Sequence, residues 1–218
     1  MRKGLTEKID AIIEKVADME CIKPYILCGG TALAMQLGHR KSEDLDFMMW
    51  RKSKNEKPEV DWPAIEKELK GKIGPIENFN MLGFDQVEFM AAGVKFSFYV
   101  SENRCPVSEP VPYLGNIRLA DVYSIMAMKM EVMLRRMKMR DYYDIYAILK
   151  AGYDISKGID MALEYSQHKL STKNIVMMLL SDRFIPDENF RQLEPKYDVS
   201  KEQIREHILQ KLKNADLS

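Results

Sequence analysis

Apolar residues recur along the chain at two spacings, one typical of helices and one typical of strands. The first 20 residues or so carry isoleucine and valine at a helical period, which predicts a helix within residues 5–19. A short apolar run at residues 25–28 predicts a buried strand, and a second helix is expected at residues 31–38. At residues 44–50, acidic and apolar positions alternate before an apolar run, as in a central strand.

The rest of the pattern divides the chain into two parts. A solvated helix is expected at residues 61–72, and two or three strands are expected within residues 78–100. Residues 101–116 hold three prolines and show no periodicity, so we place a boundary there, between domains at residues 1–112 and 113–218. Further along, the patterns are helical, which predicts an α/β part followed by a helical part.

Composition narrows the class of protein. Apolar residues make up 46% of the chain and charged residues 30%, as in soluble globular proteins. Basic and acidic residues balance at 33 each, so net charge gives no argument for binding nucleic acid. Cys21, Cys28 and Cys105 lack metal-type spacing, and the N-terminus shows no signal peptide, which favours a cytoplasmic location. No apolar run is long enough to cross a bilayer, so no membrane partner is expected.

Two acidic residues in residues 28–50 are the best candidates for chemistry. Because side chains alternate along a strand, Asp44 and Asp46 are expected on one face while Leu45 enters the core. Close carboxylates repel each other and raise each other's pKa unless a cation neutralises them. Magnesium suits such a pair, because it takes hard oxygen ligands and is often shared with substrate phosphates.

A glycine pair lies one short helix upstream of these acids. Gly29 and Gly30 allow the backbone to turn closely around an anion, and the helix that follows directs free N–H groups toward it. Taken singly, each feature is common in proteins without such a function. Together they place a phosphate site beside a metal site, which is what phosphoryl or nucleotidyl transfer requires.

The segment also resembles a known signature, GGTAL…HR.S.DLDF, of the AbiEii/AbiGii toxin family in the DNA polymerase beta-like nucleotidyltransferase superfamily. The matching positions are Gly29, Gly30, Thr31, Ala32, Leu33, His39, Arg40, Ser42, Asp44, Leu45, Asp46 and Phe47. The resemblance implies an α+β fold, in which a mixed sheet with flanking helices precedes a C-terminal helical bundle. It implies Mg²⁺ held by Asp44 and Asp46, and an NTP that contacts Gly29, Gly30, Thr31, His39, Arg40 and Ser42. It further implies an acceptor hydroxyl, for which RNA or tRNA is a candidate, and a cognate antitoxin as partner.

A second block, KMEVMLRRMKMRDYYDIYAIL, extends the resemblance into the helical part. Lys129, Arg136 and Arg140 fall on one broad face of a helix or of two abutting helices, and Asp141 and Asp144 are three residues apart. The resemblance implies that Lys129 approaches the nucleotide phosphates and that Asp141 completes the catalytic site. It also implies that Asp144 lies at the nucleotide, and that the two arginines add positive charge near the phosphates or hold Asp141 and Asp144 in place. The alternative is a surface ion-pair network, which contributes little to stability.

The chain departs from the superfamily where many members supply a third carboxylate from a later strand. Ser97 stands at that position, and Glu88 is either a substitute or a solvent-facing strand residue. Three functions therefore stay open. The first is transfer of a nucleoside monophosphate, the second is nucleotide binding without transfer or with a kinase-like transfer, and the third is an interaction module that binds an antitoxin.

Overall fold

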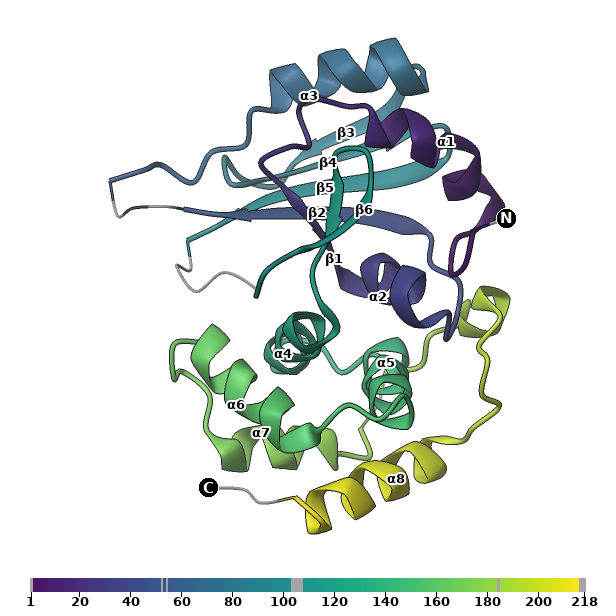
Figure 1. Cartoon of the computed structure of the whole chain (residues 1–218), viewed down its shortest axis with the longest axis vertical. Helices are drawn as coiled ribbons and strands as arrows, with labels where there is room; N and C mark the ends of the chain where they lie inside the picture. The colour runs from purple at the N-terminus through teal and green to yellow at the C-terminus, as the bar shows by residue number, and fades with distance from the viewer. Residues whose placement is uncertain (1, 52, 54, 103–107, 184, 216–218) are drawn as a thin grey trace.

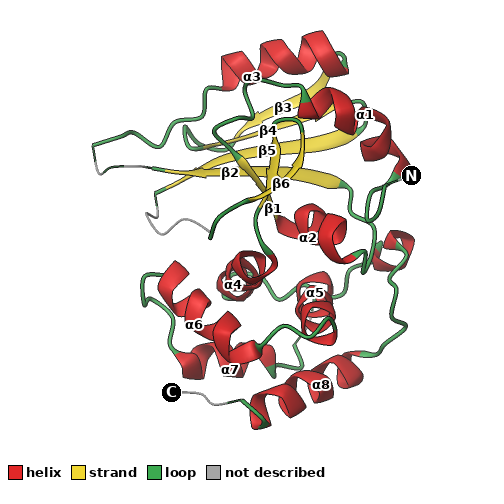
Figure 2. Ribbon diagram, viewed as in Figure 1, coloured by secondary structure: helices red, strands yellow, loops and turns green. Residues whose placement is uncertain are grey.

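A computed structural model describes residues 2–51, 53, 55–102, 108–183 and 185–215 of the chain (Figure 1). Cys105 and residues 103–107 of the proline-rich segment lie outside these ranges. Strands gather in one half of the molecule and helices fill the other half, as Figure 2 shows. This arrangement confirms the α+β fold class expected from the sequence.

The strands form one mixed sheet with the order β3-β4-β5-β2-β1-β7-β6. Their bounds are β1 (Ile26–Cys28), β2 (Asp44–Trp50), β3 (Ile76–Met81), β4 (Gln86–Ala91), β5 (Val94–Ser101), β6 (Val111–Leu114) and β7 (Ile117–Leu119). The pairs β2–β5 and β1–β7 are parallel, and the other neighbours are antiparallel. The strand predicted at residues 44–50 is therefore confirmed, and it lies at the centre of the sheet.

Helices cover both faces of the sheet. The N-terminal ones are α1 (Glu7–Ala17), α2 (Gly29–Leu37), α3 (Trp62–Glu68) and the π-helix η1 (Leu69–Ile73). In Figure 1, α1 and α3 lie on one face, while α2 lies on the other face, toward the helical half. The predicted helix at residues 61–72 is confirmed as α3 and η1, and Asp61 caps it by accepting a hydrogen bond from the Ala64 N–H at 3.3 Å.

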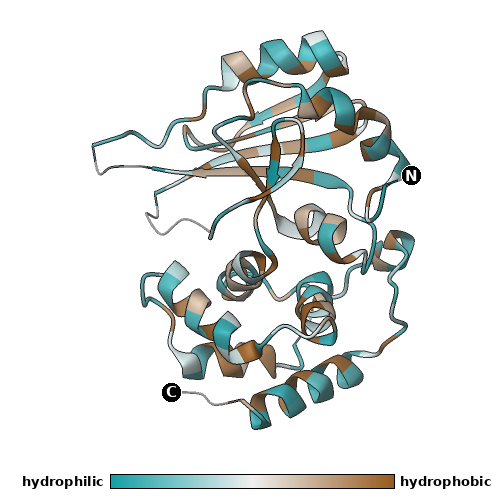
Figure 3. Cartoon of the chain, viewed as in Figure 1, coloured by the Kyte–Doolittle hydropathy of each residue, from teal (hydrophilic) through white to brown (hydrophobic). Residues whose placement is uncertain are grey.

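The helical half packs directly against the α2 side of the sheet. Its elements are α4 (Val122–Met133), α5 (Met139–Lys150), α6 (Ile155–Tyr165), α7 (Thr172–Leu179), the 3-10 helix η2 (Phe190–Leu193) and α8 (Lys201–Lys213). Figure 3 shows hydrophobic and hydrophilic residues alternating along α8, whose Ile204, Ile208 and Leu212 are buried. Because α2 contacts both α4 and α5, the two halves share one continuous hydrophobic core.

Two strands, one within the proline-rich segment and one directly after it, are not revealed by the sequence pattern. The strand β6 runs across residue 112, and β7 adds to β1 through the pairing of Leu27 with Leu119. Both strands are short, and they are ordered by long-range pairing rather than by an alternating pattern. The domain boundary at residue 112 stays a prediction. In the described part of the chain, no helix combines the length and the apolar character needed to cross a membrane.

Candidate active site

The two aspartates of β2 point to the same face of the sheet. Asp44 and Asp46 are partly exposed, whereas Leu45 and Phe47 between and after them are buried in the core. The sheet register places Asp46 beside Cys28 of β1 on one side and beside Ser97 of β5 on the other. The position where a third acid was expected is therefore occupied by a serine hydroxyl.

Asp46 has an unusual electrostatic environment. Burial, followed by the negative charge of Asp44, raises the pKa of Asp46, while Lys95 and a hydrogen bond with Ser97 act in the opposite direction. Lys95 Nζ lies 3.6 Å from Asp44 Oδ2 and 3.8 Å from Glu88 Oε1. A raised carboxyl pKa means that the surroundings disfavour the charged form of Asp46, so a further cation beside Asp46 would be favourable.

The glycine pair allows two charged groups to approach the backbone. Gly29 has a φ of +69°, and a Cβ atom there would lie 2.9 Å from Asp46 Oδ2. A Cβ atom on Gly30 would lie 2.4 Å from Arg40 Nη2, which is shorter than any normal contact. Glycine is therefore required at this turn, because any side chain would displace the Asp46 carboxylate or the Arg40 guanidinium.

Thr31 and Ser42 connect α2 to the start of β2. Their hydroxyl groups hydrogen bond to each other at 2.8 Å, and Thr31 Oγ1 also bonds to the backbone oxygen of Asp44. Both side chains are buried. They hold Asp44 in place. Neither of them is among the described residues that line the cleft between the sheet and the helical half.

Asp144 of α5 is the centre of a buried charge cluster. Arg40 donates to both of its carboxylate oxygens, from Nε at 2.7 Å and from Nη2 at 2.8 Å. Lys129 Nζ of α4 lies 2.6 Å from Asp144 Oδ2, and His39 Nε2 lies 2.7 Å from Oδ1. Each of the four residues is at most 7% exposed. The cluster joins the loop after α2 to two helices of the other half.

Burial and the neighbouring charges set the protonation states of Asp144 and His39. Burial disfavours the Asp144 carboxylate, but the charges of Arg40 and Lys129 outweigh it and hold the Asp144 pKa well below its usual value. Burial also lowers the pKa of His39, so the ring is neutral near pH 7 and donates its Nε2–H to Asp144. The other ring nitrogen, Nδ1, has no hydrogen-bond partner among the described atoms.

Lys129 reaches from this cluster to the cleft. Its ammonium also lies 3.0 Å from Asp141 Oδ1, and Arg136 Nε lies 3.3 Å from Asp141 Oδ2. Asp141 is 1% exposed, whereas the Arg136 side chain is 49% exposed at the rim. The structure thus brings Lys129, Arg136 and Asp141 together. The predicted group of Lys129, Arg136 and Arg140 is only partly formed, because Arg136 lies between α4 and α5 and Arg140 pairs with another residue.

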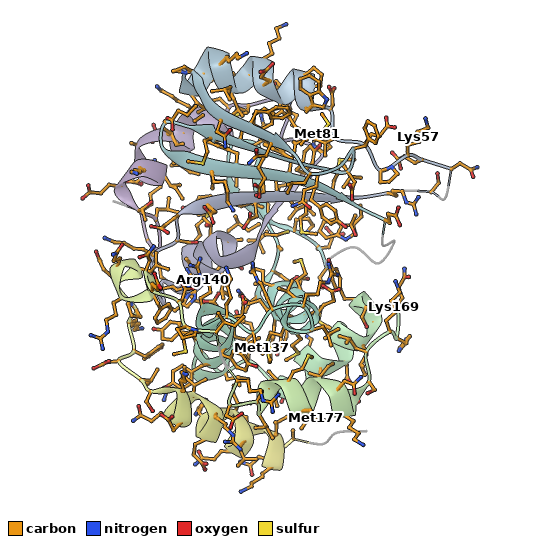
Figure 4. All side chains as sticks on the ribbon, turned by 180° about the vertical axis from the view of Figure 1, so that it is seen from behind. Lys57, Met81, Met137, Arg140, Lys169 and Met177 are labelled. Atoms are coloured by element: carbon orange, nitrogen blue, oxygen red, sulfur yellow. The ribbon has the colours of Figure 1, made fainter. Side chains whose placement is uncertain are left out.

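Arg140 makes a different ion pair. A hydrogen bond with Asp187 is the main cause of its raised pKa, although Arg140 is near enough to Asp44 and Asp141 for their charges to contribute. It pairs with Asp187 through both carboxylate oxygens, with Nη2 at 2.8 Å from Oδ1. Figure 4 shows Arg140 on the side of the helical half away from Lys169, which lines the cleft. Its partner is 47 residues further along the chain, and no local pattern indicates the pair.

A cleft of about 1280 Å³ lies between the sheet and the helical half. Six of the predicted site residues line it, namely Gly29, Gly30, Asp46, Lys129, Arg136 and Asp141. Further lining residues were not predicted from sequence, among them Arg51, Lys95, Tyr99, Tyr165 and Lys169. The volume exceeds that of most small-molecule pockets, which leaves space for a second substrate beside a nucleotide. Alternation within residues 94–100 could have indicated that Lys95 lies beside Asp44, had the pairing of β5 with β2 been known.

A mixed sheet with paired aspartates on its central strand, a Gly-Gly helix start and a cleft under a helical half defines a nucleotidyltransferase fold. The chain belongs to the nucleotidyl transferase AbiEii toxin family of type IV toxin–antitoxin systems, whose family model matches residues 13–216. The resemblance inferred from the sequence is therefore confirmed.

The chain is also similar to individual proteins. The protein aq_aa25 of Aquifex aeolicus (strain VF5), which is uncharacterised, is 28% identical over 218 residues, covering 98% of this chain and 100% of that protein. MenT4, a nucleotidyltransferase toxin from Mycobacterium tuberculosis H37Rv, matches with a TM-score of 0.60 at 17% identity, over 97% of this chain and 87% of that one. A candidate nucleotidyltransferase from H. pylori matches with a TM-score of 0.57 at 18% identity, over 95% and 91%. The two structural likenesses show the fold.

Proposed function

We propose that the protein transfers a nucleoside monophosphate from an NTP to an acceptor hydroxyl. The observation that carries this proposal is the position of Asp44 and Asp46 on one face of β2, with Asp46 in the same cleft as Lys129 and Arg136. A cleft lined by both carboxylates and cationic side chains is suited to a triphosphate and its metal ion. In the reaction, the acceptor oxygen bonds to the α-phosphorus, the bond to the β-phosphate oxygen breaks, pyrophosphate leaves, and the hydroxyl proton passes to water.

The residues present fit a divalent ion, and we propose Mg²⁺. Asp44 and Asp46 offer hard oxygen ligands, and a cation would offset the burial and the Asp44 charge that raise the pKa of Asp46. In the described part of the chain, no three His, Cys, Asp or Glu side chains gather into a metal site. The ion would therefore complete its coordination with water and phosphate oxygens, and it would supply charge neutralisation at the phosphates.

The helical half supplies the proposed phosphate contacts. Lys129 is held by Asp141 and Asp144, so its ammonium is positioned before a substrate arrives. Arg136 is half exposed at the rim and can turn toward the phosphates. His39, Arg40 and Asp144 act in this proposal by positioning Lys129, because their side chains are buried behind it.

The acceptor we propose is RNA, with tRNA as the first candidate, and the biological role is that of a toxin with a cognate antitoxin. The size of the cleft supports a second substrate, and its lining includes the cations Arg51, Arg135 and Lys169. We propose a cytoplasmic location, since NTPs are present there and the free thiols of Cys21 and Cys28 stay reduced.

The test is to incubate the protein with cell RNA and each α-labelled NTP. Wild-type protein should label RNA in a Mg²⁺-dependent manner, and Asp46→Asn should lower the rate by roughly 100-fold or more with an unchanged circular dichroism spectrum. Asp160→Asn, an exposed position on α6, is the matched control and should remain active.

Other outcomes would point to the other functions. Label transferred only from γ-labelled NTP would indicate a kinase-like reaction. An NTP-dependent thermal shift without labelled product would indicate binding alone, which the serine at position 97 would explain. An absent shift would favour an interaction module, and an active Asp46→Asn variant would refute the site.

A further inference from the structure

Lys95 places a positive charge directly beside the carboxylate pair. It lies opposite Asp44 in the parallel β2–β5 ladder, so both side chains stand on the same face of the sheet. Its Nζ atom is 3.6 Å from Asp44 Oδ2 and 3.8 Å from Glu88 Oε1 on β4. Lys95 is 36% exposed and lines the cleft together with Glu88. A single ammonium group therefore lies between two carboxylates that come from different strands.

This is the region that a second divalent ion would need. Two-metal sites hold their ions about 3.5–4 Å apart and share carboxylate oxygens between them. Here the carboxylates that could hold a second ion, Asp44 and Glu88, already face Lys95. The position next to Asp46 on β5 is Ser97, which is a weaker ligand than a carboxylate. A second ion would meet repulsion from Lys95 without gaining a third acid.

We propose that the Lys95 ammonium takes the place of a second divalent cation, so that the cleft binds one divalent ion per chain. The charges agree with this count, because Asp44, Asp46 and Glu88 carry three negative charges and Lys95 with one divalent ion carries three positive charges. The inference rests on the proposed function, in which the β2 aspartates hold a divalent ion with an NTP.

In this arrangement Glu88 has a defined part. It is not a metal ligand but the second carboxylate that holds Lys95 near Asp44. Removal of Lys95 would free Asp44 and Glu88 together, and two acids with room between them can accept a second ion. Removal of Glu88 as well would take that possibility away. Loss of Lys95 alone should therefore raise the number of bound ions, and the additional loss of Glu88 should lower it again.

The experiment counts bound Mn²⁺ by electron paramagnetic resonance of the full-length protein. The α,β-methylene analogues of the four NTPs, which cannot release pyrophosphate, are added one at a time. Wild-type protein should bind one Mn²⁺ per chain, and Lys95→Met should bind two, with spectral broadening from the neighbouring ion. The double variant Lys95→Met with Glu88→Gln should return to one ion, and Lys95→Arg should also bind one.

Lys70→Met is the matched control, since Lys70 pairs with Glu66 at 2.9 Å outside the cleft, and it should bind one ion. Two ions in wild-type protein, or one ion in a folded Lys95→Met variant, would overturn the inference while leaving the proposed transfer reaction in place. Absence of bound Mn²⁺ in wild-type protein would overturn the proposed function and this inference with it. Because Lys95 lies at the cleft surface, the variant is expected to fold, and circular dichroism verifies this.

Discussion

The replacement of Asp144 by asparagine tests how the two halves of the molecule are held together. The carboxylate is completely buried and pairs with Arg40, Lys129 and His39. Asparagine has nearly the same shape but no charge. The variant would leave the Arg40 guanidinium and the Lys129 ammonium buried at the same point, with Asp141 as the nearest remaining acid of the cluster.

The size of the effect follows from burial. Removal of one partner from a buried ion pair costs about 3–5 kcal/mol, because the remaining charge is left uncompensated. A pair on the surface contributes only about 0.2–1 kcal/mol. Since a domain is stable by about 5–15 kcal/mol in total, Asp144→Asn should remove a large share of the free energy of unfolding. For a chain of this size, the melting temperature should fall by roughly 2–4 °C for each kcal/mol lost.

The assay is urea unfolding followed by circular dichroism. Wild-type protein, Asp144→Asn and the surface control Glu66→Gln are compared at pH 7, and the free energy of unfolding is obtained by linear extrapolation. Glu66 pairs with Lys70 in an exposed i,i+4 arrangement, so its variant should differ from wild type by less than about 1 kcal/mol.

The pH dependence gives a second check on the same residue. The pKa of Asp144 lies well below 3.8 in the folded chain, so its stabilisation is present above that value and is lost as the pH falls toward the folded pKa. The difference between wild type and Asp144→Asn should therefore narrow in acid. A variant within about 1 kcal/mol of wild type at pH 7, or a difference that grows in acid, would refute the reasoning.

Two further predictions concern the neighbours of this cluster. Because burial lowers the pKa of His39 below 6.5, the unfolded chain binds the proton more readily, so stability should fall as the pH decreases below about 6.5. His39→Gln should reduce that slope in urea unfolding from pH 5 to about 7.5, with a residual slope from His207, whose pKa burial also lowers. An unchanged slope would contradict a neutral buried ring. Gly30→Ala should lower stability by about 1–3 kcal/mol, because its Cβ would lie 2.4 Å from Arg40 Nη2, whereas Gly71→Ala, with no atom within 4 Å, should not destabilise the protein. Thermal denaturation of the two variants compares them, and equal losses would contradict the close approach.

Local patterns in the sequence were enough for most of the individual elements. The strand at residues 44–50 was predicted from alternation and apolar character, and both properties arise from neighbours in the chain. The strands β6 and β7 were missed because they are ordered by pairing rather than by pattern.

Only part of the candidate site could be predicted from the sequence. The paired aspartates and the glycine turn lie within one continuous segment, so their spacing could be interpreted directly. The pairing of Arg140 with Asp187, and the position of Lys95 beside Asp44, join residues about 50 positions apart. Such contacts depend on the strand order and helix packing, which a single sequence does not specify.

The sequence by itself determined the alternation that turns Asp44 and Asp46 to one face, and the glycines that allow close approach at the turn. The tertiary structure alone decided which charges became buried partners and which remained in the cleft. The physical reason is that backbone geometry sets the direction of a side chain within its own element, whereas desolvation and ion pairing depend on elements that meet only after folding. Asp144 is such a case, since its three partners come from a loop and a helix that are separate in the chain.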